Sequence, residues 1–316
     1  MAIPTKVIMR SGPAMCERHS LHWQPGFPVD ANLTLTGLRH GHDDPTHRVE
    51  RDGTLWRTAR TASGPVTYRI RQRRLDDLFV DAWGPGSAEL IDSIRSELGA
   101  DDRPDLFRPT HPVLKAAWHR SPGLRMPCTG RLFEAIVPAI IEQRVVGLDA
   151  AASFTQLVRT YGEPAPGPAP DAMRIPPTPE VWRTVPSWAW RRAGVDLHRS
   201  RTLIRTSRYA ARLDRLAGDM AGAYALMGKL PGIGTWTAAQ VGHSALGDAD
   251  ALPLGDYHLG RMTGMALLGR PLEDKEVEEF YESFRPHRYR VFRLIELNPR
   301  LSPRRAPRMP RSRPLH

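Results

Sequence analysis

The sequence of 316 residues has few cysteines, few lysines and no long hydrophobic run. Its two cysteines, Cys16 and Cys128, are too few for a disulfide framework, a four-cysteine zinc site or an iron–sulfur cluster. No run approaches the roughly 18 apolar residues that a membrane span needs. Residues 1–15 also lack the apolar segment and cleavage site of a secretory signal. We therefore expect a protein of the reducing cytoplasm that has no membrane segment.

The scarcity of lysine affects how the charge is interpreted. The formal net charge is +11 and the pI is about 10.3, which is typical of proteins with a polyanionic partner. Only four of the 45 basic residues are lysines, however, and an arginine-rich composition is also a product of codon bias in a GC-rich genome. Residues 300–316 contain six arginines and no acid, so the charge without them is +5. The charge fits either origin, and the motifs must decide between them.

The first part of the chain has strand-like periodicity. Residues 31–36 and 66–71 alternate with period two, and residues 78–82 form a third candidate strand. A helix is predicted over 88–98, with Ser87 as its cap and Gly99 as its stop. These patterns predict an N-terminal α+β domain over residues 1–105.

The rest of the chain is predicted to be helical, so the fold class is mainly α. Apolar faces of helical period indicate helices over 132–147, 150–161, 200–213, 219–229, 235–246, 273–284 and 287–297. Seven prolines make residues 163–179 a loop. We expect two helical subdomains and a tail, namely residues 106–130 with 254–298, residues 131–253, and a disordered Arg/Pro tail over 299–316.

The most informative segment is Leu230–Ala238, which reads Leu-Pro-Gly-Ile-Gly-Thr-Trp-Thr-Ala. Pro231 cannot continue the preceding helix, and the two glycines permit a tight turn. The next helix begins at once, so its unpaired N–H groups and positive dipole end point outward from the turn. Such a turn seats a phosphate through its backbone. We expect the phosphate contacts to come from Gly232, Ile233, Gly234 and Thr235, with Lys229 beside them.

This segment resembles the hairpin of the helix-hairpin-helix (HhH-GPD) DNA glycosylase superfamily, and it is most similar to bacterial 3-methyladenine DNA glycosylase II, the AlkA type. Further matching segments occur in the expected order, at residues 122–127, 133–134, 142–146, 255–261 and 284–288. The segment at 255–261 fits the superfamily's Asp-x-His-x-x-Arg pattern. The resemblance covers about residues 15–298. It implies a helix-hairpin-helix core of two helical subdomains, preceded by an α+β domain.

Asp256 is the candidate catalytic residue. When an N-glycosidic bond breaks, positive charge develops on the sugar, and a fixed carboxylate can stabilise that charge and orient the attacking water. An aspartate in such a turn also fits helix capping, but Asp256 lies 22 residues beyond Gly234, close enough for one helix and a turn to return it to the hairpin. By resemblance, members that also cleave the backbone carry a lysine where Trp236 stands. We therefore expect a monofunctional glycosylase without lyase activity.

The target base must leave the stack to reach a carboxylate. Trp236 and Tyr257 are candidate walls of the base pocket, with core packing as the alternative. Gln143 and Arg144 stand where the family carries a glutamine and its DNA wedge. Because the family wedge is a leucine, Arg144 fits a phosphate or base contact as well as a wedge.

Two further positions depart from the family pattern. Gln240 and Glu296 stand where the alkylation-repair relatives place aromatic pocket residues, so this pocket is expected to be more polar. Glu296 would attract a cationic base or accept a hydrogen bond from a purine edge; alternatively, it pairs with Arg288 or Arg293.

The expected function is therefore excision of a damaged base, an alkylated purine, from double-stranded DNA in base-excision repair. We expect a monomer associated with the bacterial nucleoid. The histidines have no metal-site spacing, so we expect no metal and no cofactor, apart from a monovalent cation at the hairpin carbonyls that the resemblance alone implies. Two alternatives remain: a glycosylase for oxidised or deaminated bases on the same scaffold, and a non-catalytic DNA-binding or damage-recognition protein. The tail either adds nonspecific phosphate binding or is inert.

Overall fold

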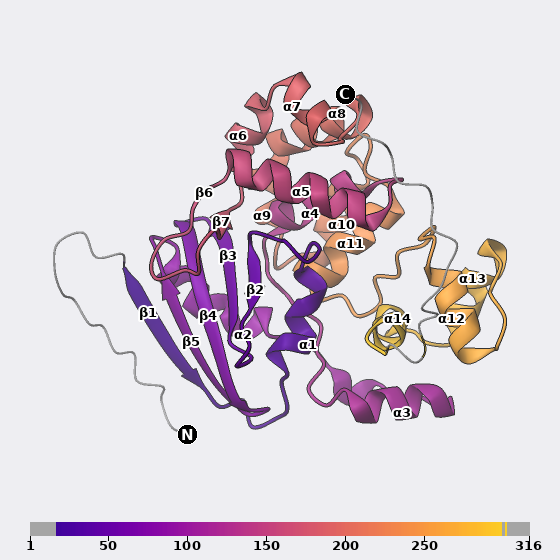
Figure 1. Ribbon diagram of the computed structural model, residues 1–316. Helices are drawn as coiled ribbons and strands as arrows, with labels where there is room; N and C mark the ends of the chain where they lie inside the picture. The colour runs from indigo at the N-terminus through magenta and orange to yellow at the C-terminus, as the bar shows by residue number, and fades with distance from the viewer. Residues whose placement is uncertain (1–16, 299–300, 302–316) are drawn as a thin grey trace.

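The structure is a computed structural model that describes residues 17–298 and residue 301. Cys16, the N-terminal residues 1–15 and nearly all of the Arg/Pro tail lie outside the described residues. Figure 1 shows three groups of elements: a sheet, a group of helices above it, and a second group of helices beside both.

The N-terminal part is an antiparallel five-stranded sheet with the strand order β1-β5-β4-β3-β2. The strands are β1 (Arg18–Trp23), β2 (His47–Val49), β3 (Leu55–Thr61), β4 (Gly64–Arg74) and β5 (Asp77–Trp83). Val66, Tyr68 and Ile70 alternate along β4 and are buried in one core with α2 (Ser87–Glu97). The strands expected at 66–71 and 78–82 and the helix expected at 88–98 are therefore present.

The strand expected at residues 31–36 is wrong, because these residues form helix α1 (Ala31–Leu35). The side chain of Asp30 accepts a hydrogen bond from the Leu33 amide at 2.9 Å, which caps the helix. Residues 36–38 (η1) continue it as a short 3-10 turn. Figure 1 shows α1 between the sheet and α14, so this segment joins two parts of the molecule.

The upper group contains the longest helices and its own apolar core. Its elements are α4 (Leu132–Glu142), α5 (Gly147–Tyr161), α6 (Pro179–Thr184), α7 (Ser187–Arg192), α8 (Leu197–Thr206), η3 (Ser207–Tyr209), α9 (Ala210–Asp214), α10 (Met220–Met227) and α11 (Thr235–Ala245). The proline-rich loop forms only a two-stranded ribbon, β6 (Glu163–Pro164) with β7 (Arg174–Ile175). The helix expected over 132–147 ends at Glu142, because Gln143 leaves the helical conformation and bonds to the hairpin.

The second helical group comes from two separate stretches of sequence that share one core. Its elements are η2 (Pro104–Leu106), α3 (Pro112–Arg120), α12 (Leu259–Leu267), α13 (Asp274–Glu282) and α14 (Arg288–Glu296). Among the described residues, no helix combines the length and the apolar character needed to span a membrane.

A buried ion-pair network joins the sheet to the upper helices. The Glu97 carboxylate accepts hydrogen bonds from Arg57 of β3 at 2.7 Å and from Arg131, just before α4, at 3.0 Å. Tyr68 of β4 donates to the same carboxylate. The two arginines hold the pKa of Glu97 below its usual value although burial opposes them. Because all these charges are buried, loss of one partner would leave the other uncompensated.

Candidate active site

The glycine hairpin connects α10 to α11 and is held by core packing on one side. Leu230 and Ile233 are buried in the upper core, so Ile233 can reach a ligand only through its backbone. Gly232 has φ +94° and lies against Thr202 of α8, where a Cβ would approach the threonine Oγ1 to 2.4 Å. Gly234 and Thr235 are exposed at the start of α11, where no side chain caps the helix. The predicted phosphate seat is therefore open at the surface, with the exposed Lys229 preceding it.

The end of α4 is attached to this hairpin through Gln143. Its Nε2 donates to the carbonyl of Gly232 at 2.8 Å and to Oγ1 of Thr237 at 2.9 Å. The side chain is thus used within the protein as a brace. The next residue, Arg144, is exposed and has φ +58°, a conformation that costs a non-glycine residue about 1 kcal/mol or more.

The loop that carries Asp256 is fixed from α14. Asp250 accepts hydrogen bonds from Arg285 at 2.8 Å and from the guanidinium of Arg288 at 2.9 Å. Arg290 adds a backbone hydrogen bond to the carbonyl of Ala249 at 3.2 Å. The segment resembling the family's terminal motif therefore positions the loop that carries Asp256.

Both oxygens of the Asp256 carboxylate accept a hydrogen bond. Oδ1 accepts from the amide of His258 at 2.8 Å, which forms the turn that leads into α12. Oδ2 accepts from Nε1 of Trp236, in the first turn of α11, at 3.2 Å. Asp256 therefore takes part in the turn before α12 and also reaches back to the hairpin helix. The free lone pairs leave each oxygen able to act on a further group.

Asp256 borders a cavity with a volume of about 350 Å³ between η1 with the residues that follow it, α4, α5, α11, α12 and α14. This volume lies within the range of small-molecule sites. Gln240 and Glu296 line it, as expected, whereas Trp236 and Tyr257 are not among its lining residues. Trp236 bonds to Asp256 instead, and Tyr257 is 60% exposed. The N-terminal part of the chain also contributes to the wall, which was not anticipated from the sequence. The residues it contributes are Thr36, Gly37, Arg39, His40 and Gly41.

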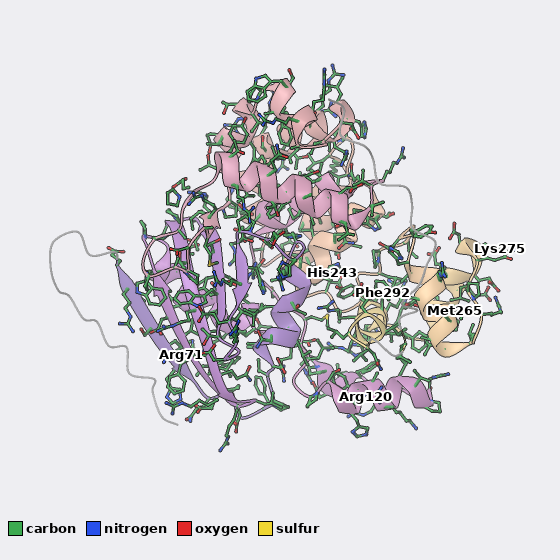
Figure 2. The ribbon with its side chains drawn as sticks, viewed as in Figure 1. Arg71, Arg120, His243, Met265, Lys275 and Phe292 are labelled. Atoms are coloured by element: carbon green, nitrogen blue, oxygen red, sulfur yellow. The ribbon has the colours of Figure 1, made fainter. Side chains whose placement is uncertain are left out.

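The cavity has an aromatic wall that the sequence analysis also missed. The rings of His243 and Tyr289 are stacked, with centroids 3.8 Å apart and an angle of 4° between their planes. Burial and the charge of Arg293 lower the pKa of His243 to about 3, so the imidazole is neutral. Its Nε2–H donates to Oε1 of Gln240 at 2.9 Å. Figure 2 shows His243 and Phe292 toward the middle of the molecule, with Met265 and Lys275 farther out on the second helical group.

Helical periodicity was the signal that could have found this wall. Trp236, Gln240 and His243 are spaced by four and then three residues along α11, so they share one face. Tyr289, Phe292, Arg293 and Glu296 are spaced in the same way along α14. Both faces point into the cavity or toward Asp256.

Two carboxyl groups besides Asp256 border the cavity. Glu296 pairs with Arg293 at 3.3 Å while 32% of its side chain remains exposed, so it has both features considered from the sequence: an ion pair and a place in the wall. Burial raises the pKa of Glu296 despite Arg293. Glu142, at the end of α4, was given no role from the sequence. Burial and the charges of Asp256 and Glu296 raise its pKa to about 7.

The hairpin carbonyls, where the resemblance implies a monovalent cation, accept hydrogen bonds within the protein. The carbonyls of Leu230, Pro231 and Gly232 already accept hydrogen bonds from Ile233, Arg205 and Gln143, and Arg205 adds a positive charge next to Pro231. We derive no step from a bound cation. Within residues 17–298 no group of His, Cys, Asp and Glu side chains is arranged to hold a metal ion.

No family model matches the chain. The chain is 29% identical over 228 residues to a probable bifunctional transcriptional activator/DNA repair enzyme AlkA of Mycobacterium tuberculosis. That match covers 71% of this chain but 41% of the relative, so the chain spans less than half the length of the curated relatives it matches.

Two solved DNA glycosylase structures have folds similar to that of this chain. A 3-methyladenine DNA-glycosylase from Archaeoglobus fulgidus superimposes with a TM-score of 0.72 at 18% identity, covering 87% of this chain and 97% of that chain. An 8-oxoguanine glycosylase/lyase of Clostridium acetobutylicum, in complex with double-stranded DNA, does so with a TM-score of 0.62 at 11% identity, covering 93% and 96%. The resemblance seen in the sequence is confirmed: this chain has the fold of the helix-hairpin-helix DNA glycosylases and resembles the AlkA type in sequence.

Proposed function

We propose that this chain is a DNA N-glycosylase that flips a damaged base, an alkylated purine, out of double-stranded DNA and hydrolyses its N-glycosidic bond in base-excision repair. The observation that carries the proposal is the hydrogen bond from Trp236 to Asp256. It connects the helix that begins at the phosphate seat to the carboxylate that borders the cavity. A protein that only binds DNA needs the hairpin but has no use for this carboxylate.

In the proposed reaction the hairpin holds the DNA backbone while the flipped base enters the cavity. As the bond between the sugar and the base breaks, positive charge develops on the sugar, and the carboxylate of Asp256 stabilises it. The second lone pair of either oxygen can orient the attacking water. The hydrogen bonds from His258 and Trp236 keep the carboxylate in one orientation, so little reorganisation is needed during the reaction.

We further propose that the reaction is monofunctional. Cleavage of the backbone through a Schiff base needs an amine within reach of the sugar. Trp236 occupies the hairpin position of the lysine nucleophile, and in the described part of the chain no lysine lines the cavity. Lys229 lies on the α10 side of the hairpin.

The polarity of the cavity favours a second candidate substrate class, oxidised or deaminated bases. Its wall includes Glu142, Gln240 and Glu296. Carboxyl and amide groups can hydrogen-bond to the edge of a neutral base and can also attract a cationic one.

The test compares the wild-type chain with Asp256→Asn and with Asp171→Asn, a control that removes a carboxylate from the exposed loop before β7. Duplexes carry 7-methylguanine, 3-methyladenine, hypoxanthine, ethenoadenine or 8-oxoguanine, and release of the free base is measured in single turnover. We expect release by the wild type and the control but not by Asp256→Asn. Tight DNA binding with no release of any base would favour a non-catalytic binding protein. Strand cleavage without added alkali would contradict the monofunctional assignment.

A further inference from the structure

Glu142 is a carboxyl group on the cavity wall that the proposed reaction has not yet used. It is the last residue of α4, its side chain is half-buried, and it borders the same cavity as Asp256. A Cβ on Gly147 would lie 3.5 Å from its Oε1, so the start of α5 closes in on one side of the group. Within residues 17–298 no hydrogen bond or ion pair satisfies this carboxyl, which therefore remains free to bond to a guest in the cavity.

The two arginines that line the cavity bond to groups other than Glu142. Arg293 pairs with Glu296 at 3.3 Å, and Arg39 donates to the carbonyls of Gly41 at 2.9 Å and His42 at 2.6 Å. Burial lowers the pKa of His40 and of His243, so both imidazoles are neutral. The ionisable groups that line this space with Glu142 are Arg39, His40, His243, Asp256, His258, Tyr289, Arg293 and Glu296.

The balance of these charges favours the protonated form of Glu142. Burial is the largest cause, and Asp256 and Glu296 add negative potential, so the pKa of Glu142 is about 7. At neutral pH the group is therefore divided between an acid, which can donate a proton, and a carboxylate, which can accept one. Asp256, by contrast, accepts hydrogen bonds from two N–H groups. One cavity thus contains a carboxyl with two N–H donors and a second carboxyl, Glu142, that faces the cavity from α4.

We propose that Glu142 is a general acid that donates its proton to the departing base, so that this site excises neutral purine lesions as well as cationic alkylated ones. This inference rests on the proposed glycosylase function. As the C1′–N9 bond breaks, its electron pair passes to the base, which takes the Glu142 proton at N3 or N7. Water adds its oxygen to C1′ and loses a proton to Asp256. Asp256 then releases this proton to solvent, and solvent returns one to Glu142.

The consequence is a difference between two classes of lesion. A nucleotide of 7-methylguanine or 3-methyladenine already carries a positive charge on its base, so its base leaves without a further proton. Hypoxanthine and ethenoadenine are neutral, and their departure is assisted by an acid. General acid catalysis typically contributes about 10²–10⁴-fold. Only the neutral class should therefore depend on the acid form of Glu142.

The experiment compares wild type, Glu142→Gln and the control Glu278→Gln, which removes a carboxyl from the exposed face of α13. Glutamine keeps the size of the side chain but has no proton to transfer. Single-turnover release of hypoxanthine, ethenoadenine and 7-methylguanine is measured between pH 5.5 and 9. We expect Glu142→Gln to lose about 100-fold or more on the two neutral lesions and less than about threefold on 7-methylguanine. Wild-type release of neutral lesions should fall as the pH rises through about 7, and the variant should lack this decrease.

The outcomes separate the inference from the function on which it rests. Retained release of 7-methylguanine shows that Glu142→Gln is folded, so a selective loss on neutral lesions supports the acid role. Equal losses on both lesion classes, or no loss on either, would overturn that role and leave the glycosylase assignment intact. A wild-type protein that releases 7-methylguanine but neither neutral lesion would overturn it as well. If the wild type releases no base of any kind, the glycosylase function itself fails.

Discussion

Replacement of Glu142 by glutamine should stabilise the folded chain at alkaline pH. The pKa of the carboxyl is 4.5 in an ordinary environment and about 7 in the folded state. Because the pKa is raised in the folded state, folding favours the protonated carboxyl. The contribution of this group to the free energy of unfolding is present in full below pH 4.5 and is lost as the pH rises through about 7. One pKa unit corresponds to about 1.4 kcal/mol, so ionisation of Glu142 lowers the free energy of unfolding by at most about 3.4 kcal/mol. Solvent in the open cavity screens part of this, so we expect about 2 kcal/mol at pH 8.

The assay is urea unfolding of wild type, Glu142→Gln and Glu278→Gln at pH 4.5 and pH 8, followed by circular dichroism. Comparison of variant with wild type at each pH cancels the titration of all other groups. We expect the free energy of unfolding of Glu142→Gln to exceed that of the wild type by about 2 kcal/mol at pH 8 and by less than about 0.5 kcal/mol at pH 4.5. The exposed control should differ little from the wild type at either pH. A variant that is no more stable at pH 8 than at pH 4.5, relative to wild type, would refute the claim that the cavity disfavours this charge.

Three further predictions concern the elements that position the site. Trp236→Phe removes the hydrogen bond to Oδ2 of Asp256 and should slow base release about tenfold while DNA affinity stays within twofold. Single-turnover kinetics and fluorescence anisotropy measure the two effects. A decrease in the release rate of less than twofold would show that the tryptophan does not position the carboxylate. Gly232→Ala should lower the free energy of unfolding by about 2 kcal/mol because of its positive φ and its contact with Thr202, whereas Gly234→Ala, with open space around its Cβ, should cost under about 1 kcal/mol. Asp250→Asn weakens the attachment of the Asp256 loop to Arg285 and Arg288 and should reduce the rate of base release more than DNA affinity; equal effects on both would contradict this positioning role.

The helices could be predicted from the sequence because their periodicity, caps and stops are local properties. The segment 235–246 is an example: α11 spans Thr235–Ala245 and begins directly after the second glycine of the hairpin. The error at 31–36 has a physical cause. Its alternation is compatible with a strand, and the competing signal was the cap residue Asp30, whose side chain bonds to the Leu33 amide. The helix forms although six residues alternate as in a strand, because tertiary contacts fix the segment. Ala31 and Leu35 are buried in the core of the sheet, and Leu33 packs against the core that contains α14.

The candidate site could be predicted only where a motif carried it. The hairpin and Asp256 have a recognisable spacing, and the structure joins them through Trp236. The burial of Glu142 depends on α5 and on charges contributed by residues 256 and 296, which are more than a hundred positions away in sequence. No local pattern reports such an arrangement. The stacked His243 and Tyr289 come from α11 and α14 in the same way, and only their helical spacing was available in advance.

The segment that follows α1 also contributes to the cavity. Residues 36–41 come from the N-terminal part of the chain, yet they close one side of the cavity that Asp256 borders. A Cβ at Gly37 would lie 3.4 Å from the guanidinium of Arg293. Gly41 lies against Ala151 of α5. The buried Glu97 network fixes this part of the chain against α4, the helix that ends in Glu142 and Gln143.

The end of α4 contributes to both the hairpin and the cavity. Gln143 braces the glycine hairpin, and the preceding Glu142 faces the cavity. If α4 shifted by even 1 Å, backbone grip and cavity chemistry would change together, because both depend on adjacent residues. The buried charges next to the other end of α4 therefore fix the position of both residues, the brace at the hairpin and the carboxyl at the cavity.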